Sequence, residues 1–145
     1  MNVDRLLLLL RAETRSVDRI GSLYLCKSSV QLSAYYDIVH GEGLAILIPH
    51  WLRHMLREDN VWKYVEYGVN VWGIDPALPE MEIANKAIAA TAAFFKAMNL
   101  PATLREVGID ESKFDVMAAR AGAGLQKAFV PMTAEDVKEI YKKSL

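Results

Sequence analysis

Apolar residues recur at intervals of three and four along almost the whole chain, and this spacing constrains the fold more than any other feature. A helix brings residues i, i+3, i+4 and i+7 onto one face, whereas a half-buried strand needs apolar and polar residues to alternate. Strand-like alternation is missing, as are the Asn-Gly and Asp-Gly pairs typical of hairpins. The sequence therefore predicts an all-α fold.

The pattern predicts helices over residues 43–56, 61–72, 81–98 and 108–122, and a last helix after Pro131. An earlier helix is expected to end near Asp37. Gly73, Pro101, Gly122 and Gly124 are predicted helix ends, Asp110 or Ser112 a cap, and Thr133 with Asp136 a near capping box. The predicted inward residues are Leu44, Leu47, Ile48, Trp51, Leu52 and Met55; Val61, Tyr64, Val65, Val69 and Trp72; Ile83, Ala87, Ile88, Thr91, Phe94 and Phe95; Phe114, Met117, Ala118 and Ala121; and Val137, Ile140 and Tyr141.

A length of 145 residues suits one domain, and without an internal repeat or a long linker the helices are expected to form a single bundle. The apolar run at residues 6–10 could be a core helix, but it is too short for a membrane span. The net charge is −1 and the basic residues are scattered, so we expect neither nucleic acid nor a membrane as partner. One cysteine suits a reducing compartment, and we expect the cytoplasm.

His40 and Cys26 are the first candidate metal ligands. His40 lies where two predicted helices meet, and a neutral imidazole there is a suitable ligand for zinc or ferrous iron. The alternative is a hydrogen-bonded histidine packed at a helix junction. Cys26 precedes His40 by 14 residues, and its thiolate could bind the same metal, or it could simply be a small buried residue.

His50 and His54 are four residues apart, which places both on one face of a helix and permits metal chelation if a third ligand converges. Trp51 stands where a zinc-protease motif has glutamate, and the flanking arginines favour an ordinary solvent-exposed helix face. The sequence has no glycine-rich phosphate loop and no Ser-His-Asp arrangement, so neither phosphate binding nor triad chemistry is predicted.

Several separated motifs occur together in one order: "QLSAYYDIVHGEGLAILIPHW", "YGVNVWGID", "AIAATAAFFKAMNLPATLREVGID" and "FVPMTAEDVKEIYK". With these motifs, residues 31–145 resemble the C-terminal helical domain of the iron-containing alcohol dehydrogenases, in particular their butanol dehydrogenase branch. Residues 1–30 have no clear family match. We therefore expect a dehydrogenase-like helical domain over residues 31–145, preceded by a segment that comes from a disrupted reading frame, a rearranged gene or an alternative start.

The resemblance implies a two-domain enzyme that interconverts alcohols and aldehydes, with NAD or NADP in a Rossmann-like domain and iron or zinc in the cleft between domains. One aspartate and three histidines hold the metal in the family. His40 matches the last of these histidines, the preceding one falls at Cys26, and a further cleft histidine falls at Val30. No histidine precedes His40, and Asp4 and Asp18 have no matching surroundings. The implied metal ligands in this chain are thus His40 and Cys26, with no catalytic residue carried over.

The resemblance thus implies the metal-side domain of an NAD(P)-dependent alcohol dehydrogenase, truncated and inactive alone, that holds neither metal nor dinucleotide firmly. Its expected partner is a second copy or a separate nucleotide-binding chain. The alternative is a non-enzymatic helical module that self-associates or binds a partner through the former interdomain face. A third interpretation is a small metal-binding protein that uses Cys26, His40 and either His50 or His54.

Overall fold

The computed structural model describes the backbone of residues 19–123 and 131–145, and side chains within residues 25–123 and 131–145. These residues form α-helices and short 3-10 turns without any strand, which confirms the predicted all-α fold. The apolar run at residues 6–10 and the predicted stop at Gly124 lie outside the described residues. The helices are α2 (Arg19–Tyr36), α3 (His40–Met55), α4 (Val61–Trp72), α5 (Glu80–Ala97), α6 (Phe114–Gly122) and α7 (Ala134–Lys143), with 3-10 turns η2 (Arg105–Val107) and η3 (Glu111–Lys113) before α6.

The helix boundaries follow from local chemistry that the sequence makes visible. Asp37 adopts a left-handed conformation with φ 56°, which ends α2 at the predicted place. Gly73 ends α4 in the same way, with φ 67°, a conformation that glycine adopts at little cost. Thr133 caps α7 in a complete capping box with Asp136, as predicted. The three-residue connection after α2 leads directly into α3, so the end of one helix lies close to the start of the next.

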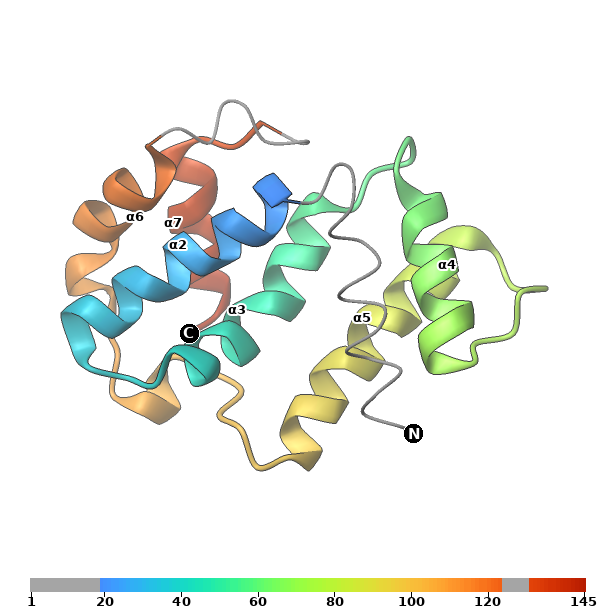
Figure 1. Ribbon diagram of the computed structural model, residues 1–145, viewed down its shortest axis with the longest axis horizontal. Helices are drawn as coiled ribbons and strands as arrows, with labels where there is room; N and C mark the ends of the chain where they lie inside the picture. Colours follow the sequence, from blue (N-terminus) through green and yellow to red (C-terminus); the bar gives the residue numbers. More distant parts are fainter. Residues whose placement is uncertain (1–18, 124–130) are drawn as a thin grey trace.

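Helix α3 is the centre of the molecule. It packs against α2 and α7 on one side and against α5 on the other, while α4 packs on α5 (Figure 1). The predicted single apolar stripe on α3 is partly wrong, because this helix has neighbours on several sides. Ala45 and Ile46, which the stripe omits, are buried. Of the six predicted inward residues, only Leu47 and Met55 are fully buried, while the partly exposed ones are Leu44, Ile48, Trp51 and Leu52.

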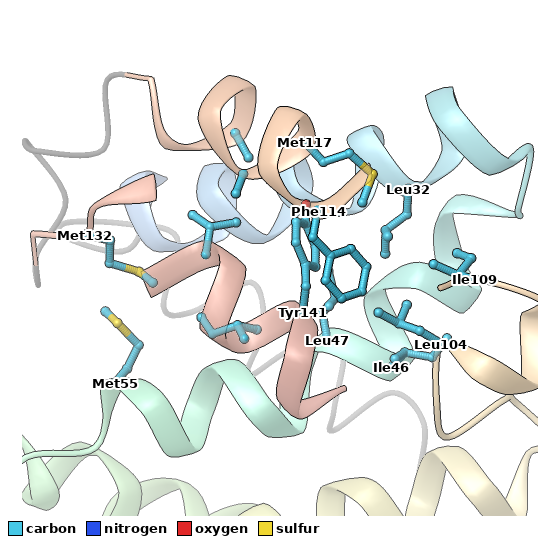
Figure 2. Packing of buried hydrophobic residues seen from close by; sticks show 14 residues of the cluster. Leu32, Ile46, Leu47, Met55, Leu104, Ile109, Phe114, Met117, Met132 and Tyr141 are labelled. Atoms are coloured by element: carbon cyan, nitrogen blue, oxygen red, sulfur yellow. The ribbon is translucent and has the colours of Figure 1, made fainter. Parts of the chain in front are cut away.

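The main core lies between α2, α3, α6 and α7 (Figure 2). Phe114 and Tyr141 pack with ring centroids 5.3 Å apart, and Leu32 and Leu47 are completely buried beside them. The inward residues predicted for the helix at 108–122 and for the last helix are all buried, which confirms both predicted faces. Burial of side chains of this size stabilises a fold by about 1.5–3 kcal/mol each. The four helices are thereby held as one unit.

A second, smaller core joins α4 to α5. Val61 and Tyr64 of α4 pack against Ala84 and Ile88 of α5. Gly68 permits this close approach, because a Cβ at that position would lie 2.7 Å from the Ile83 side chain. The α4–α5 hairpin therefore has its own packing and reaches the rest of the molecule mainly through the contact of α5 with α3.

Candidate metal centre

The structure brings Cys26 and His40 together at the junction of α2 and α3. The Cys26 Sγ atom lies 3.5 Å from His40 Nε2, although the two residues are 14 positions apart. Cys26 comes from the exposed side of α2, and His40 is the first residue of α3. A bond from the buried end of α7 holds this turn of α2, because the Tyr141 hydroxyl donates to the Ser28 carbonyl over 2.9 Å. Both candidate ligands thus come from well-packed helices.

Ser29 fixes the orientation of the His40 ring. Its side chain is fully buried, and its hydroxyl donates to the His40 carbonyl over 2.9 Å. The same oxygen lies 3.0 Å from His40 Nδ1. A hydroxyl has one hydrogen to donate, so while that hydrogen goes to the His40 carbonyl, the ring nitrogen is the donor in the contact with Nδ1. In the neutral imidazole, Nδ1 then carries the proton and the lone pair of Nε2 faces Cys26.

Gly43 makes this arrangement possible, one turn after His40 on α3. A Cβ at Gly43 would lie 2.6 Å from the Ser29 hydroxyl oxygen, which is closer than real Cβ contacts come. The absence of a side chain therefore leaves room for the Ser29 hydroxyl between the two helices. Gly41, on the same helix, has nothing within 4 Å of such a position. The requirement for glycine is specific to the position that faces Ser29.

The spacing of the two donor atoms fits a shared metal ion. Zinc bonds of about 2.3 Å to sulfur and about 2.0–2.1 Å to nitrogen, at a tetrahedral angle, separate the donors by about 3.5–3.6 Å. The observed 3.5 Å matches that separation. The same contact is a hydrogen bond from the thiol to Nε2 while the thiol keeps its proton, and a metal ion would replace that proton.

The pair has no third ligand of the usual kind among the described residues, where no group of three or more His, Cys, Asp or Glu side chains could hold a metal. Val30, one turn after Cys26 on α2, is 46% exposed and offers no donor atom. Two protein ligands fix two corners of a coordination sphere. The remaining corners need water, substrate or residues from elsewhere.

His50 and His54 are not on a solvent-exposed helix face, so that prediction is wrong. The side chain of His54 is only 12% exposed, and its Nε2 atom lies 3.4 Å from Asp136 Oδ1 in the first turn of α7. Burial lowers the pKa of His50, with smaller contributions from the charges of Arg53 and Lys143. Helix α3 packs against α7, which explains why these two histidines are partly covered although arginines lie near them in the sequence.

Burial by itself would raise the pKa of Asp136, but hydrogen bonds from the Thr133 backbone and hydroxyl, together with His54, lower it overall. The carboxylate thus has two roles, because it completes the capping box of α7 and pairs with α3. This contact stabilises the packing of two helices and shows no convergence of metal ligands.

Comparison with known proteins decides the family. Residues 20–145 match the family model described as "Fe-containing alcohol dehydrogenase family, C-terminal". The chain is 49% identical over 117 residues to NADH-dependent butanol dehydrogenase A of Clostridium acetobutylicum, a match that covers 79% of this chain and 30% of the relative. This chain belongs to the iron-containing alcohol dehydrogenase family. The resemblance inferred from the sequence motifs is thereby confirmed.

Two solved structures of oxidoreductases contain the same helical fold. The crystal structure of a 1,3-propanediol oxidoreductase matches with a TM-score of 0.75 and 28% identity, over 84% of this chain and 32% of that one. The NADH-dependent butanol dehydrogenase A of Thermotoga maritima matches with a TM-score of 0.70 and 29% identity, over 83% of this chain and 32% of that one. The chain thus spans about a third of the length of the relatives it matches.

The range that matches the iron-containing dehydrogenase family begins inside α2, before the motif at residue 31, and includes both Cys26 and His40. Sequence reasoning found these two residues but missed Ser29 and Gly43, which set the ring orientation. One signal was available, because Ser29 is three residues after Cys26 and therefore on the same side of a helix. Within the described residues, no helix has the length and apolar character needed to cross a membrane.

Proposed function

We propose that this chain supplies the metal-side helical domain of an NAD(P)-dependent alcohol dehydrogenase of the butanol dehydrogenase type. The observation that supports it best is the Cys26–His40 pair, whose donor atoms have the spacing of adjacent corners in a tetrahedral site. Membership of the iron-containing family gives the reaction class. The nicotinamide and the remaining ligands would come from a nucleotide-binding domain, in the same polypeptide or in a separate chain.

In this proposal each residue has a defined task. His40 binds through Nε2, because Ser29 occupies Nδ1, and Cys26 binds through its deprotonated sulfur. A bound divalent ion, iron or zinc, would supply Lewis-acid polarisation of the alcohol or aldehyde oxygen beside the nicotinamide. Gly43 keeps α2 and α3 close enough for the pair to form.

The 145-residue chain alone is expected to hold neither the metal nor the dinucleotide firmly and to have no dehydrogenase activity. Two ligands leave the ion with most of its shell open, and Val30 contributes no donor where the family has a cleft histidine. Loss of an outer-shell contact alone costs about 10–100-fold in metal affinity or activity, and loss of a ligand itself should cost at least as much. Activity should therefore require both a nucleotide-binding domain and a more complete ligand set.

A matched pair of chimeras tests this function. Residues 20–145 replace the corresponding C-terminal part of NADH-dependent butanol dehydrogenase A of Clostridium acetobutylicum, in the native form and with Cys26→His plus Val30→His. Butanal-dependent NADH oxidation is measured for both. We expect the restored chimera to be at least about 10-fold more active than the native one, and His40→Ala to abolish its activity. A folded, restored chimera without activity, or one indifferent to His40→Ala, would contradict the proposal.

A second candidate is the non-enzymatic interaction module. It is favoured by two exposed apolar residues, each close in the sequence to a candidate ligand. Val39 precedes His40 and is 67% exposed, and Val30 is four residues after Cys26 and is 46% exposed. Contact surfaces between proteins are rich in exposed apolar side chains of this kind. The expected occupant is a second copy of this chain or a nucleotide-binding chain. Sedimentation equilibrium of the native chain and of Val39→Glu tests self-association through this surface. Val39→Glu should weaken the dimer, and a dimer of unchanged affinity in this variant would show that the surface is not used.

A further inference from the structure

The candidate site pairs two chemically different donors, and this difference indicates which ions it accepts. The family resemblance implies imidazole and carboxylate ligands at this site, whereas this chain presents a thiol at Cys26. We propose that Cys26 and His40, with Ser29 as a positioning residue, form a thiophilic half-site that binds Zn²⁺ or Co²⁺ in strong preference to Fe²⁺. The inference rests on the proposed function for its location, but metal binding is measured without any dehydrogenase activity.

The first step is the chemistry of the donor atoms. A thiolate is a soft ligand that favours zinc and other thiophilic ions, while Fe²⁺ in open sites is typically held by histidines and a carboxylate. Cys26 is on the exposed side of α2, so an ion can reach its sulfur from solvent. When the ion binds, the thiol proton is released to the buffer and the sulfur takes the metal in its place.

The second step is the orientation of His40. Ser29 donates to the His40 carbonyl and accepts from Nδ1–H, so the ring is held by two contacts to one buried hydroxyl. Of the two ring nitrogens of His40, only Nε2 is then left to bind a metal, and it lies 3.5 Å from Cys26 Sγ. The metal would therefore meet a pair that needs no rotation of the ring before binding. A support of this kind raises metal affinity about 10–100-fold in known sites.

The third step is the choice of a control for Ser29, namely a hydroxyl on the same helix that does not hold the His40 ring. Ser33 lies one turn after Ser29 on α2, and its hydroxyl donates to the Ser29 carbonyl over 3.3 Å, whereas the His40 ring bonds to Ser29 and Cys26. A Ser33→Ala variant therefore removes a hydroxyl from the same helix but leaves the His40 contacts in place. It is the matched control for Ser29→Ala.

The test is a Co²⁺ titration of the full 145-residue chain under anaerobic conditions, followed by absorption spectroscopy. The titration is carried to saturation, because two ligands hold the ion only weakly. We expect a thiolate-to-cobalt charge-transfer band in the near ultraviolet, because sulfur binds the ion directly. Cys26→Ser should remove the band and weaken binding at least about 10-fold, and His40→Ala should weaken binding similarly. Absence of the band at saturating Co²⁺, or its persistence in Cys26→Ser, would overturn the inference.

Metal preference is measured by competition of Zn²⁺ and Fe²⁺ for the Co²⁺-loaded chain. The native chain should favour Zn²⁺ over Fe²⁺ by a ratio at least about 10-fold larger than the Cys26→His variant, which presents two imidazoles. Equal ratios in the two proteins would overturn the assignment of Cys26 as the residue that determines selectivity. Circular dichroism of each variant verifies that the helices are intact.

The positioning role of Ser29 has its own readout, the ¹⁵N chemical shifts of the His40 ring. In the native chain, without added metal, Nδ1 should be the protonated nitrogen. Ser29→Ala should lose this preference and bind Co²⁺ at least about 10-fold more weakly, with an unchanged band position. Ser33→Ala should behave as the native chain. The positioning role of Ser29 would be overturned by protonation on Nε2 in the native chain, or by a Co²⁺ affinity of Ser29→Ala equal to that of the native chain. An inactive restored chimera, together with an intact cobalt band in the native 145-residue chain, would instead contradict only the proposed function.

Discussion

Two histidines stand near the opposite ends of α3, and the structure places them in different surroundings. His40, at the start, faces a thiol and a hydroxyl on α2, and its Nε2 lies next to a sulfur atom at the surface. His54, in the last turn, is only 12% exposed and faces the Asp136 carboxylate on α7. One end of the helix thus presents a candidate ligand pair, whereas the histidine at the other end pairs with a carboxylate of α7. The two histidines differ because their partner residues differ: Cys26 and Ser29 on α2 for His40, and Asp136 on α7 for His54.

The largest expected effect comes from disturbing the His40 end through Gly43→Ala. The new Cβ would lie 2.6 Å from the Ser29 hydroxyl, so α2 and α3 must move apart or Ser29 must leave the His40 ring. Overpacking of this kind destabilises by about 1–3 kcal/mol. We expect a lower free energy of unfolding in urea and weaker Co²⁺ binding, while the His54–Asp136 contact persists.

Gly41→Ala is the matched control on the same helix. Nothing lies within 4 Å of the Cβ it would add, and alanine in a helix is favoured over glycine by about 0.5–1 kcal/mol. The variant should therefore be as stable as the native chain or slightly more so, with unchanged Co²⁺ binding. If both glycine variants lose the same stability, the close approach of Ser29 is not the reason that Gly43 is required.

The next effect concerns the His54 end. Asp136→Ala removes the carboxylate that bonds the Thr133 backbone and hydroxyl and pairs with His54. The loss of a carboxylate in a first helical turn and of a partly exposed ion pair should cost about 1 kcal/mol in urea unfolding. Co²⁺ binding should be unchanged. Glu135→Ala, on the exposed side of the same turn, is the control, and an equal loss there would contradict the special role of Asp136.

Two titratable groups near the His54 end, His50 and Asp136, should each give a distinct step in the pH dependence of the free energy of unfolding. The pKa of His50 is lowered, chiefly by burial, so its contribution is present above the unfolded value of about 6.5 and is lost as the pH falls below it. The pKa of Asp136 is also lowered, so its contribution is lost only at more acidic pH, below about 3.9. The free energy of unfolding should therefore fall with decreasing pH in both windows.

Urea unfolding at a series of pH values measures these steps. His50→Gln should remove the step near about pH 6.5, and Asp136→Asn should remove the more acidic one. A native chain whose stability rises as the pH falls from about 7 to about 5 would contradict the direction derived for His50.

The smallest effect on stability should come from Cys26→Ser. The side chain is exposed, and its hydrogen-bond contact within the part of the chain that the structure describes is the long one to His40. Surface substitutions of this kind change stability by less than about 0.5 kcal/mol. Metal binding, by contrast, should change strongly. A large loss of stability together with unchanged Co²⁺ binding would reverse the contrast between the two ends of α3.

The sequence predicted those features that depend on local spacing. The inward face of α6, with Phe114 and Met117, follows from one period of 3.6 residues, and the capping box at Thr133 follows from a three-residue spacing. The resemblance to the family pointed to Cys26 and His40, and the structure adds that the two lie together. Their roles as metal ligands stay a prediction.

The features that the sequence did not reveal depend on contacts between distant segments. The periodicity assigns one apolar face to a helix, but α3 has neighbours on several sides, so the burial of Ile46 was missed. His54 was placed on a solvent-exposed face because Asp136, its partner, is far away along the chain. The bond of Ser29 to His40 likewise exists only because α2 and α3 pack closely at Gly43.

The most direct measurement is the anomalous scattering of zinc in crystals of the 145-residue chain grown with Zn²⁺. The strongest anomalous peak is predicted about 2.3 Å from Cys26 Sγ and about 2.0 Å from His40 Nε2. A strongest peak at the His54–Asp136 pair, with none beside Cys26, would contradict the assignment of the two ends of α3.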